Sequence, residues 1–426
     1  MKQTNNAIKF LMAQYRAIFQ NAYFKGLATA AVVTAGLAAG QAQAALSVYG
    51  DTQTSTQATV TIDGTSTDAK NDLKDYAKLT VTDKTKTFQD QTIIIKDGLV
   101  ATPVNEVKAN AANAKLTVKN LEIKAGDATK GLKVHSAGAF RSDLNVLDTT
   151  TITSGTLQLA GNAADAEKRA YLDTKKISIN GAKTADAVLD LGGFTTAGHG
   201  VAVDASGTTT KQATLISLDG KGTIKFGGAD EADALLNGQF VGDGEAILNF
   251  TGKGTVSAFG TINKASVKIA DKMNAKISLT DNEQTVADEG TLTINEGDIE
   301  LTAAGSVMTI DKGTVVLGDK VTLTSIAPST AASIVIGNGT DEGALVVKKG
   351  TVDGFLGAKT NTGGIDLKAK GVLQFSDASV DLSGLEIVAT AKTAKIAAAD
   401  GAFVVGNNVT VSNALTGDGK ANVMIS

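Results

Sequence analysis

The stretch GTLTINEGDIELTAAGSVMTIDKGTVVLGDKVTLT, residues 290–324, decides the fold that we expect for this chain. It consists of short runs in which apolar and polar residues alternate, such as Thr291–Ile294 and Val307–Ile310. Four glycines recur between these runs every seven or eight residues, at positions 290, 297, 305 and 313. Period-two alternation bounded by Gly, Asp and Asn is typical of half-buried β-strands.

Strands this short and this regular indicate a chain that winds, so that each strand stacks on the strand one turn earlier. The pattern therefore predicts an all-β fold, a right-handed β-solenoid (β-helix) of short strands. In that fold Ile294 and Ile310 face inward, whereas Thr293 and Thr309 face outward. A meandering β-sandwich gives a similar local pattern and stays open as the alternative, although sandwich domains are typically about 100 residues long.

Similar alternating runs continue along most of the chain. The first ones are 58–62, 78–81, 92–95 and 115–118. Three segments are instead compatible with helices, namely 68–77, 104–114 and 162–172. We therefore expect three parts: a signal peptide with an extended n-region at 1–44, an irregular β-rich part at 45–175 and the solenoid repeats at 176–426.

The composition of the 426 residues favours a thin, stacked core over a large globular one. Trp is absent and aromatic residues make up only 4% of the chain, while glycines number 46. The absence of cysteine excludes disulfides, thiolate metal sites and thiol nucleophiles. The formal net charge is −4, and residues 1–44 carry four basic and no acidic residues, which leaves 36 basic and 44 acidic residues beyond them, or −8. An acidic chain with so few arginines is a poor nucleic-acid binder, so no nucleic-acid partner is expected.

Residues 1–44 have the layout of a cleavable signal helix. Basic residues precede the apolar run 27–39, and the segment ends in Ala42-Gln43-Ala44, a small-residue cleavage signal. A transmembrane anchor needs about 20 apolar residues, more than this run provides. Apolar residues spaced by three and four within 8–23 predict an amphipathic helix in the n-region. We expect cleavage before Ala45 and export of the remaining chain.

A long n-region ahead of an ordinary signal, followed by Thr-, Gly- and Ala-rich β-repeats from about residue 58, resembles type V secreted proteins of diderm bacteria. These are the autotransporter passenger domains and large surface adhesins, and the similarity is one of layout and pattern. The resemblance implies a protein at the cell surface, associated with the outer membrane or extracellular, whose partner is a protein or glycan ligand on another surface.

The end of the chain departs from that family, because it lacks the aromatic girdles of a membrane β-barrel. This difference indicates either a passenger-like protein that is exported by other means or an incomplete gene product. The last turn of a solenoid also needs a cap, and nothing after Val409 resembles one, so we expect an open C-terminal edge through which the chain self-associates or pairs with a separate membrane anchor.

Residues that carry catalytic or metal-binding chemistry are few. His135 and His199 are the only histidines, and both are expected to be surface residues. The best calcium candidates are acidic residues in glycine-containing turns: Asp230, Glu231, Asp233, Asp341 and Glu342. The evenly spaced carboxylates of a calcium loop are missing around them. We therefore predict no catalytic residue, no metal ligand and no cofactor.

Three functions are compatible with these features. An exported structural or adhesive surface protein, not an enzyme, accounts for the signal segment and the repeats. The alternative is a secreted polysaccharide-active β-helix enzyme, which needs two or three clustered carboxylates in a groove. A periplasmic binding module would need two lobes and a cleft, which the repeats do not suggest.

Overall fold

The computed structural model describes the chain between Val48 and Ile425, with gaps. The residues that are not described are 1–47, 52–54, 65–74, 97–104, 138, 162–168, 183–186, 199–200, 204–208, 212–213, 228–233, 271–273, 280–289, 303–304, 326–332, 349–350, 354–363, 376–385, 390–394, 399–409, 414–421 and 426. The expected signal helix at 1–44 and the cleavage position before Ala45 therefore lie outside the described residues.

The described residues form 31 strands and no helix, which confirms the expected all-β class. The strands of the N-terminal half are β1 (Val48–Gly50), β2 (Thr59–Ile62), β3 (Asp75–Tyr76), β4 (Lys78–Thr82), β5 (Thr85–Lys96), β6 (Asn105–Ala109), β7 (Ala114–Lys124), β8 (Gly131–Ser136), β9 (Ser142–Ala160), β10 (Ala170–Ile179), β11 (Ala187–Leu191), β12 (Thr195–Ala197), β13 (Val201–Val203), β14 (Thr209–Lys211), β15 (Leu215–Leu218) and β16 (Lys221–Phe226). The strands of the C-terminal half are β17 (Ala234–Val241), β18 (Glu245–Phe250), β19 (Gly254–Ile269), β20 (Asn274–Ser278), β21 (Thr291–Leu301), β22 (Val307–Ser325), β23 (Ser333–Ile336), β24 (Gly343–Val347), β25 (Thr351–Asp353), β26 (Gly364–Leu367), β27 (Gly371–Phe375), β28 (Glu386–Ala389), β29 (Lys395–Ala398), β30 (Thr410–Asn413) and β31 (Asn422–Ile425).

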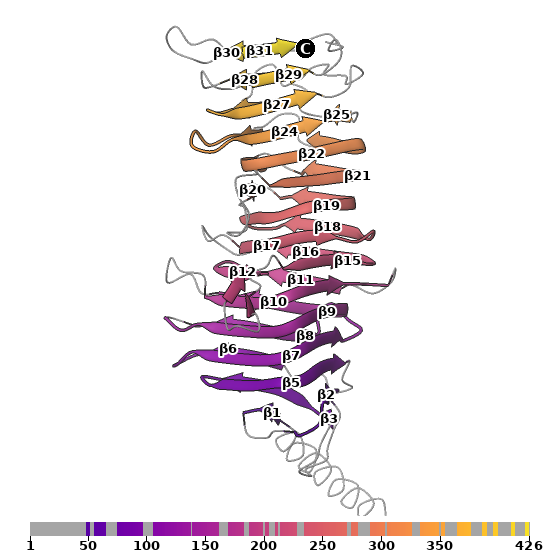
Figure 1. The fold of residues 1–426 in the computed structure, drawn as a ribbon, viewed down its shortest axis with the longest axis vertical. Coiled ribbons are helices and arrows are strands. Elements are labelled where there is room, and N and C mark those ends of the chain that lie inside the picture. Colours follow the sequence, from indigo (N-terminus) through magenta and orange to yellow (C-terminus); the bar gives the residue numbers. More distant parts are fainter. Residues whose placement is uncertain are drawn as a thin grey trace, which may run out of the picture.

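Twenty-nine of these strands belong to one sheet, and every pairing between its strands is parallel. The strands lie across the long axis of the molecule and follow one another along it in sequence order, from β1 to β31 (Figure 1). Strands β13 and β14 form a separate antiparallel pair. Parallel partners cannot be joined by tight hairpins, so each strand pairs with a segment well removed in sequence.

One inward-facing column of side chains shows how regular the stacking is. Its members occupy the same register position on successive strands, and we call it the Val81 column: Val81, Val107, Val134, Leu159, Leu191, Phe226, Phe250, Ile269 and Leu301. Successive members are 19 to 35 residues apart in sequence, and all nine are at most 1% exposed. The rings of Phe226 and Phe250 stack face to face, with centroids 4.4 Å apart and planes inclined by 4°.

The sequence runs around residues 290–324 join into longer strands than we expected. Strand β21 covers two of the runs and β22 covers three, because the parallel ladder continues through the intervening turn residues. Gly297 makes one of these bends with φ +126°, and a Cβ there would lie 1.8 Å from the carbonyl oxygen of Ala265 on the neighbouring strand. Only glycine fits so close an approach of two backbones in that conformation.

The expected orientation of the alternating residues is confirmed. Ile294 is 2% exposed and Ile310 is fully buried, whereas Thr293 and Thr309 are partly exposed on the outer surface. Ile294 pairs in register with Ile262 on β19 and with Leu317 on β22, so it lies in a second apolar column.

The prediction of helices in the three helix-compatible segments is wrong wherever the structure describes their residues. Strand β6 occupies Asn105–Ala109 within 104–114, β3 lies at the described end of 68–77, and β10 begins within 162–172. In β6 the burial alternates strictly, since Val107 lies in the Val81 column while Glu106 and Lys108 face outward. Stacking on β4 and β8 therefore overrides the weak local helix propensity. The expected division of the chain near residue 175 stays a prediction.

The N-terminal end of the sheet holds an aromatic cluster. Tyr49 packs against Tyr76 and Phe88, with ring centroids 5.1 and 4.6 Å away. The Tyr49 hydroxyl donates a hydrogen bond to Gln91 Oε1, and Gln91 Nε2 donates to the Gln57 carbonyl at 2.8 Å. Burial raises the pKa of Tyr49 far above its usual value. This cluster covers the first strands with the large rings that most of the core lacks.

The register can be tested by placing a charge on either side of one strand. Ile294→Asp buries an unpaired carboxylate in an apolar column, so the free energy of unfolding should fall by about 3 to 5 kcal/mol. Thr293→Asp, on the adjacent outward position, is the matched control and should change it by less than about 0.5 kcal/mol. Denaturant unfolding of both variants measures the difference, and equal losses would contradict the assigned register.

Candidate functional site

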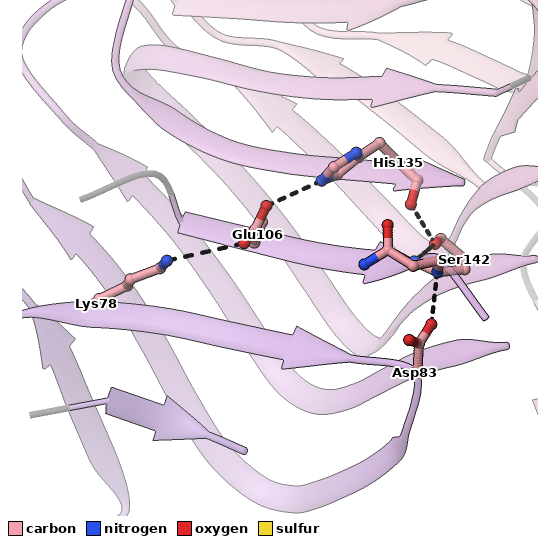
Figure 2. Close-up of polar contacts among 7 residues, drawn as sticks. Lys78, Asp83, Glu106, His135 and Ser142 are labelled. Atoms are coloured by element: carbon pink, nitrogen blue, oxygen red, sulfur yellow. Dashed lines mark hydrogen bonds and ion pairs between the residues drawn. The ribbon is translucent and has the colours of Figure 1, made fainter. Parts of the chain in front are cut away.

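The described residue with the most versatile side-chain chemistry is His135, on β8. Its ring Nε2 lies 3.1 Å from Glu106 Oε2 on β6, and the other carboxylate oxygen of Glu106 lies 3.8 Å from Lys78 Nζ on β4 (Figure 2). The three side chains thus form a chain of polar contacts across three strands. All three are partly exposed, His135 at 21% and Glu106 at 20%.

The strand register creates this group. In β6 and β8 every second residue is buried, so Glu106 and His135 both face outward. The parallel register places His135 beside Lys108 and Glu106 beside Lys133, and the imidazole reaches Glu106 diagonally. The expected surface position of His135 is therefore only partly right, since the ring is half-buried and hydrogen-bonded.

A serine lies close to His135 but does not contact its ring. Ser142, which is fully buried, donates its hydroxyl to the backbone carbonyl of His135 at 2.6 Å and accepts the N–H of Ala109 at 3.0 Å (Figure 2). A nucleophilic serine needs its hydroxyl on the imidazole nitrogen. Ser142 instead satisfies two backbone groups, so the arrangement ties neighbouring strands together and does not assemble a Ser–His pair.

Asp83, which lies next to β4, also binds backbone groups of another segment of the chain. Its Oδ1 accepts the N–H groups of Asn110, Ala111 and Ala112 at 2.5, 3.0 and 3.2 Å, and its own φ is +53°. These backbone hydrogen bonds, that of Asn110 foremost, lower the pKa of the Asp83 carboxyl. The carboxylate thus caps the turn that follows β6, about 27 residues further along the chain.

Sequence reasoning missed Asp83, Ser142 and Glu106 as interacting residues. Asp83 lies in the turn Thr82-Asp83-Lys84, where an acidic residue typically binds backbone N–H groups of its own turn. Its actual partners instead belong to the turn that follows β6. Glu106 and Ser142 lie in segments whose register cannot be read without the structure.

The environment of His135 lowers its pKa below the ordinary value. Burial is the largest cause, and the cations of Lys133 and Lys108 act in the same direction, whereas the hydrogen bond and charge of Glu106 raise it. On the side of β9 the register neighbour of His135 is Ala160, which carries no charge. The neutral imidazole is therefore the form that the folded state favours near neutral pH.

This lowered pKa predicts how stability depends on pH. The unfolded chain binds the His135 proton more readily, so the stability from this residue is full above about pH 6.5 and falls as the pH drops below it. His135→Gln should remove that part of the decline between pH 7.5 and 5. Glu106→Gln should steepen it, because the carboxylate that raises the pKa is gone. Urea unfolding at a series of pH values measures both slopes, and identical slopes in all three proteins would contradict this assignment.

The calcium candidates do not gather into a site where the structure describes them. Asp341 lies 3.8 Å from Lys312 Nζ, and its backbone N–H donates to Asn338 Oδ1 at 2.8 Å in a local turn. Lys370 Nζ donates to the neighbouring Thr340 carbonyl at 2.6 Å. Two cations next to this turn oppose binding of a third. Across the described residues no three His, Asp or Glu side chains come together. His199, Asp230, Glu231 and Asp233 lie outside the described residues.

In one outward row, the charges on successive strands alternate in sign. We call this row the Lys221 column, because its register positions hold Lys221, Glu245, Lys264, Glu296 and Lys320. Glu245 lies 3.5 Å from Lys221 and 3.6 Å from Lys264, and Lys320 lies 3.6 Å from Glu296. Carboxylates paired in this way with lysines differ from the clustered acids of a polysaccharide-active site.

Comparisons of the chain with protein-family models, with curated proteins and with solved structures found no match. In the part of the chain that the structure describes, no helix is both long and apolar enough to cross a membrane.

Proposed function

We propose that this chain is an exported structural or adhesive protein of the cell surface, built as a right-handed β-solenoid. The observation that carries the proposal is the single parallel sheet that extends from β1 to β31, with apolar columns inside and polar columns outside. Such a stack offers a long, regular surface, and several of its ionisable side chains contact neighbouring strands.

Three features of the sheet support a solenoid. Within the large sheet the described pairings are all parallel, and β9 pairs with four later or earlier strands, β7, β8, β10 and β11, along its length. Strand β22 likewise pairs with β20 and β23 along its first part, and with β21, β24 and β25 further along. Connections between parallel strands of one sheet are almost always right-handed, which favours that hand for the proposed solenoid.

The surface location rests on the first 44 residues and on the resemblance to autotransporter passenger domains and large surface adhesins. Export of the chain after cleavage before Ala45 would place it at the cell surface, on the outer membrane or outside a diderm bacterium. Its partner would be a protein or glycan ligand on another surface, and nucleic acid is not expected as one. Self-association through the edge of β30 and β31, or pairing with a separate membrane anchor, stays a prediction.

An adhesive role agrees with how the described polar groups are used. Glu106, Asp83 and Glu245 contact cations or backbone N–H groups of other strands, and Ser142 is held by backbone atoms. These contacts stabilise the stack and leave the long outer rows of side chains as the feature available to a ligand.

Export can be tested by expressing the full chain in a diderm bacterium. Sequencing the N-terminus of the purified product should give Ala45 as the first residue, and protease added to intact cells should digest it. In a control variant, Ala42→Leu with Ala44→Leu, the bulky side chains should block cleavage, because the signal needs small residues there. A wild-type product that retains Met1 and resists protease in intact cells would contradict the proposal.

A further inference from the structure

The turn between β23 and β24 places an asparagine–glycine pair at the surface of the stack. Asn338 and Gly339 are both exposed, and Gly339 has φ +92°. When glycine follows asparagine, no Cβ hinders the backbone nitrogen of the glycine from attacking the side-chain amide carbon of the asparagine. Because both groups belong to one chain, the attack is intramolecular and closes a five-membered cyclic imide.

The side-chain amide of Asn338 is polarised by its neighbours. Its Oδ1 accepts the backbone N–H groups of Thr340 and Asp341 at 2.7 and 2.8 Å. Its Nδ2 donates to Asp341 Oδ2 at 3.5 Å, which orients the amide plane. Attack on the amide carbon moves negative charge onto Oδ1, so the two N–H groups are placed like the donors of an oxyanion hole. The turn therefore stabilises the tetrahedral intermediate that leads to the imide.

The attacking nitrogen is held only lightly. The Gly339 N–H donates to the Ala369 carbonyl at 3.1 Å, and this hydrogen bond has to break before the nitrogen attacks. Breaking one such bond at the surface costs about 1 kcal/mol. The space around Gly339 is open, because among the described residues a Cβ there would meet only the Cβ of Ala369, at 3.7 Å. The backbone at residue 339 can therefore turn toward the amide.

Two further asparagine–glycine pairs have more constrained glycines. Gly238, which follows Asn237, is buried within β17, and a Cβ there would lie 2.3 Å from the Thr214 carbonyl oxygen. The Oδ1 of Asn237 is buried without a hydrogen-bond partner among the described residues, so no donor stabilises charge on it.

The other pair is Asn180–Gly181, at the end of β10. Asn180 is exposed, but Gly181 is buried and forms an antiparallel bridge with Lys221, whose N–H donates to the Gly181 carbonyl at 3.1 Å. The structure thus separates three pairs with the same two residue types, and Asn338–Gly339 combines exposure, an open glycine and two donors on Oδ1.

We propose that Asn338 is a site of spontaneous, intramolecular modification. The Gly339 nitrogen gives its proton to solvent and bonds to Asn338 Cγ. The Cγ–Nδ2 bond breaks, and the side-chain nitrogen takes up a proton and leaves as ammonia. Water then opens the imide at either carbonyl, which gives aspartate or its β-linked isomer, isoaspartate. The only co-reactant is water, and no oxidation or reduction takes place.

The surroundings of the turn suit the product. Either product adds a carboxylate where two cations already lie, since Lys312 Nζ is 3.8 Å from Asp341 Oδ1 and Lys370 Nζ donates to the Thr340 carbonyl at 2.6 Å. Opposite charges this close favour the ionised product over the neutral amide. The inference concerns this turn alone and does not depend on the proposed function.

The three pairs can be compared within one sample. The purified full chain is kept folded at about pH 8.5, where loss of the glycine N–H proton is faster, and is then digested and analysed by peptide mass spectrometry with isoaspartate detection. Conversion at Asn338 should be at least about tenfold faster than at Asn237, and faster than at Asn180. Asn338→Gln is the assay control, because a longer side chain closes a less favourable ring; its peptide should stay unmodified and its thermal midpoint unchanged.

Unfolding the chain separates the effect of the structure from that of the sequence. In concentrated urea the three asparagines should convert at similar rates, because each is followed by glycine and none keeps its folded contacts. Conversion at Asn338 that is no faster than at Asn180 in the folded chain, or the same order of rates with and without urea, would overturn the proposal. A peptide in which Lys312 is joined to residue 338 would overturn it as well, since the lysine amine would then be the nucleophile.

Discussion

The structure depends on the parallel register between successive strands. A parallel ladder fixes the strand spacing at about 4.8 Å and places residues of the same register position directly above one another. Each position along a strand therefore becomes a column that runs through the stack. The Val81 column contains nine apolar residues, all at most 1% exposed, and buries them without any large globular core. This explains how a chain with 4% aromatic residues and no Trp forms an extended apolar interior.

The same constraint governs the outer surface. Two like charges in neighbouring positions of a column would lie about 5 Å apart and destabilise the pairing. The Lys221 column alternates cation and carboxylate at five successive positions, and Glu106 contacts both Lys78 and His135. Each exposed pair contributes little on its own. Together they allow charged residues to stack one above another along the outside of the sheet.

Alternation along the chain predicted the strands and their buried sides well, as Ile294 and Thr293 show. Local pattern failed where tertiary stacking decides the outcome. The segment 104–114 has helix-compatible residues, yet β6 forms there because Val107 completes a column with Val81 and Val134. The contacts of His135 with Glu106 and of Asp83 with the turn after β6 were missed for a related reason. The connections between strands vary in length, so the sequence alone does not show which residues of two strands lie side by side.

Distances between spin labels along one column test the stacking most directly. Thr223 and Thr322 occupy the same outward column, four strand spacings apart, and Thr156 lies six spacings from Thr322. With cysteines introduced at each pair, double electron–electron resonance should give distances near 19 and 29 Å, apart from the label linkers. The account predicts narrow distributions in that ratio. Distances that do not increase with the number of intervening strands would contradict the parallel, in-register stack.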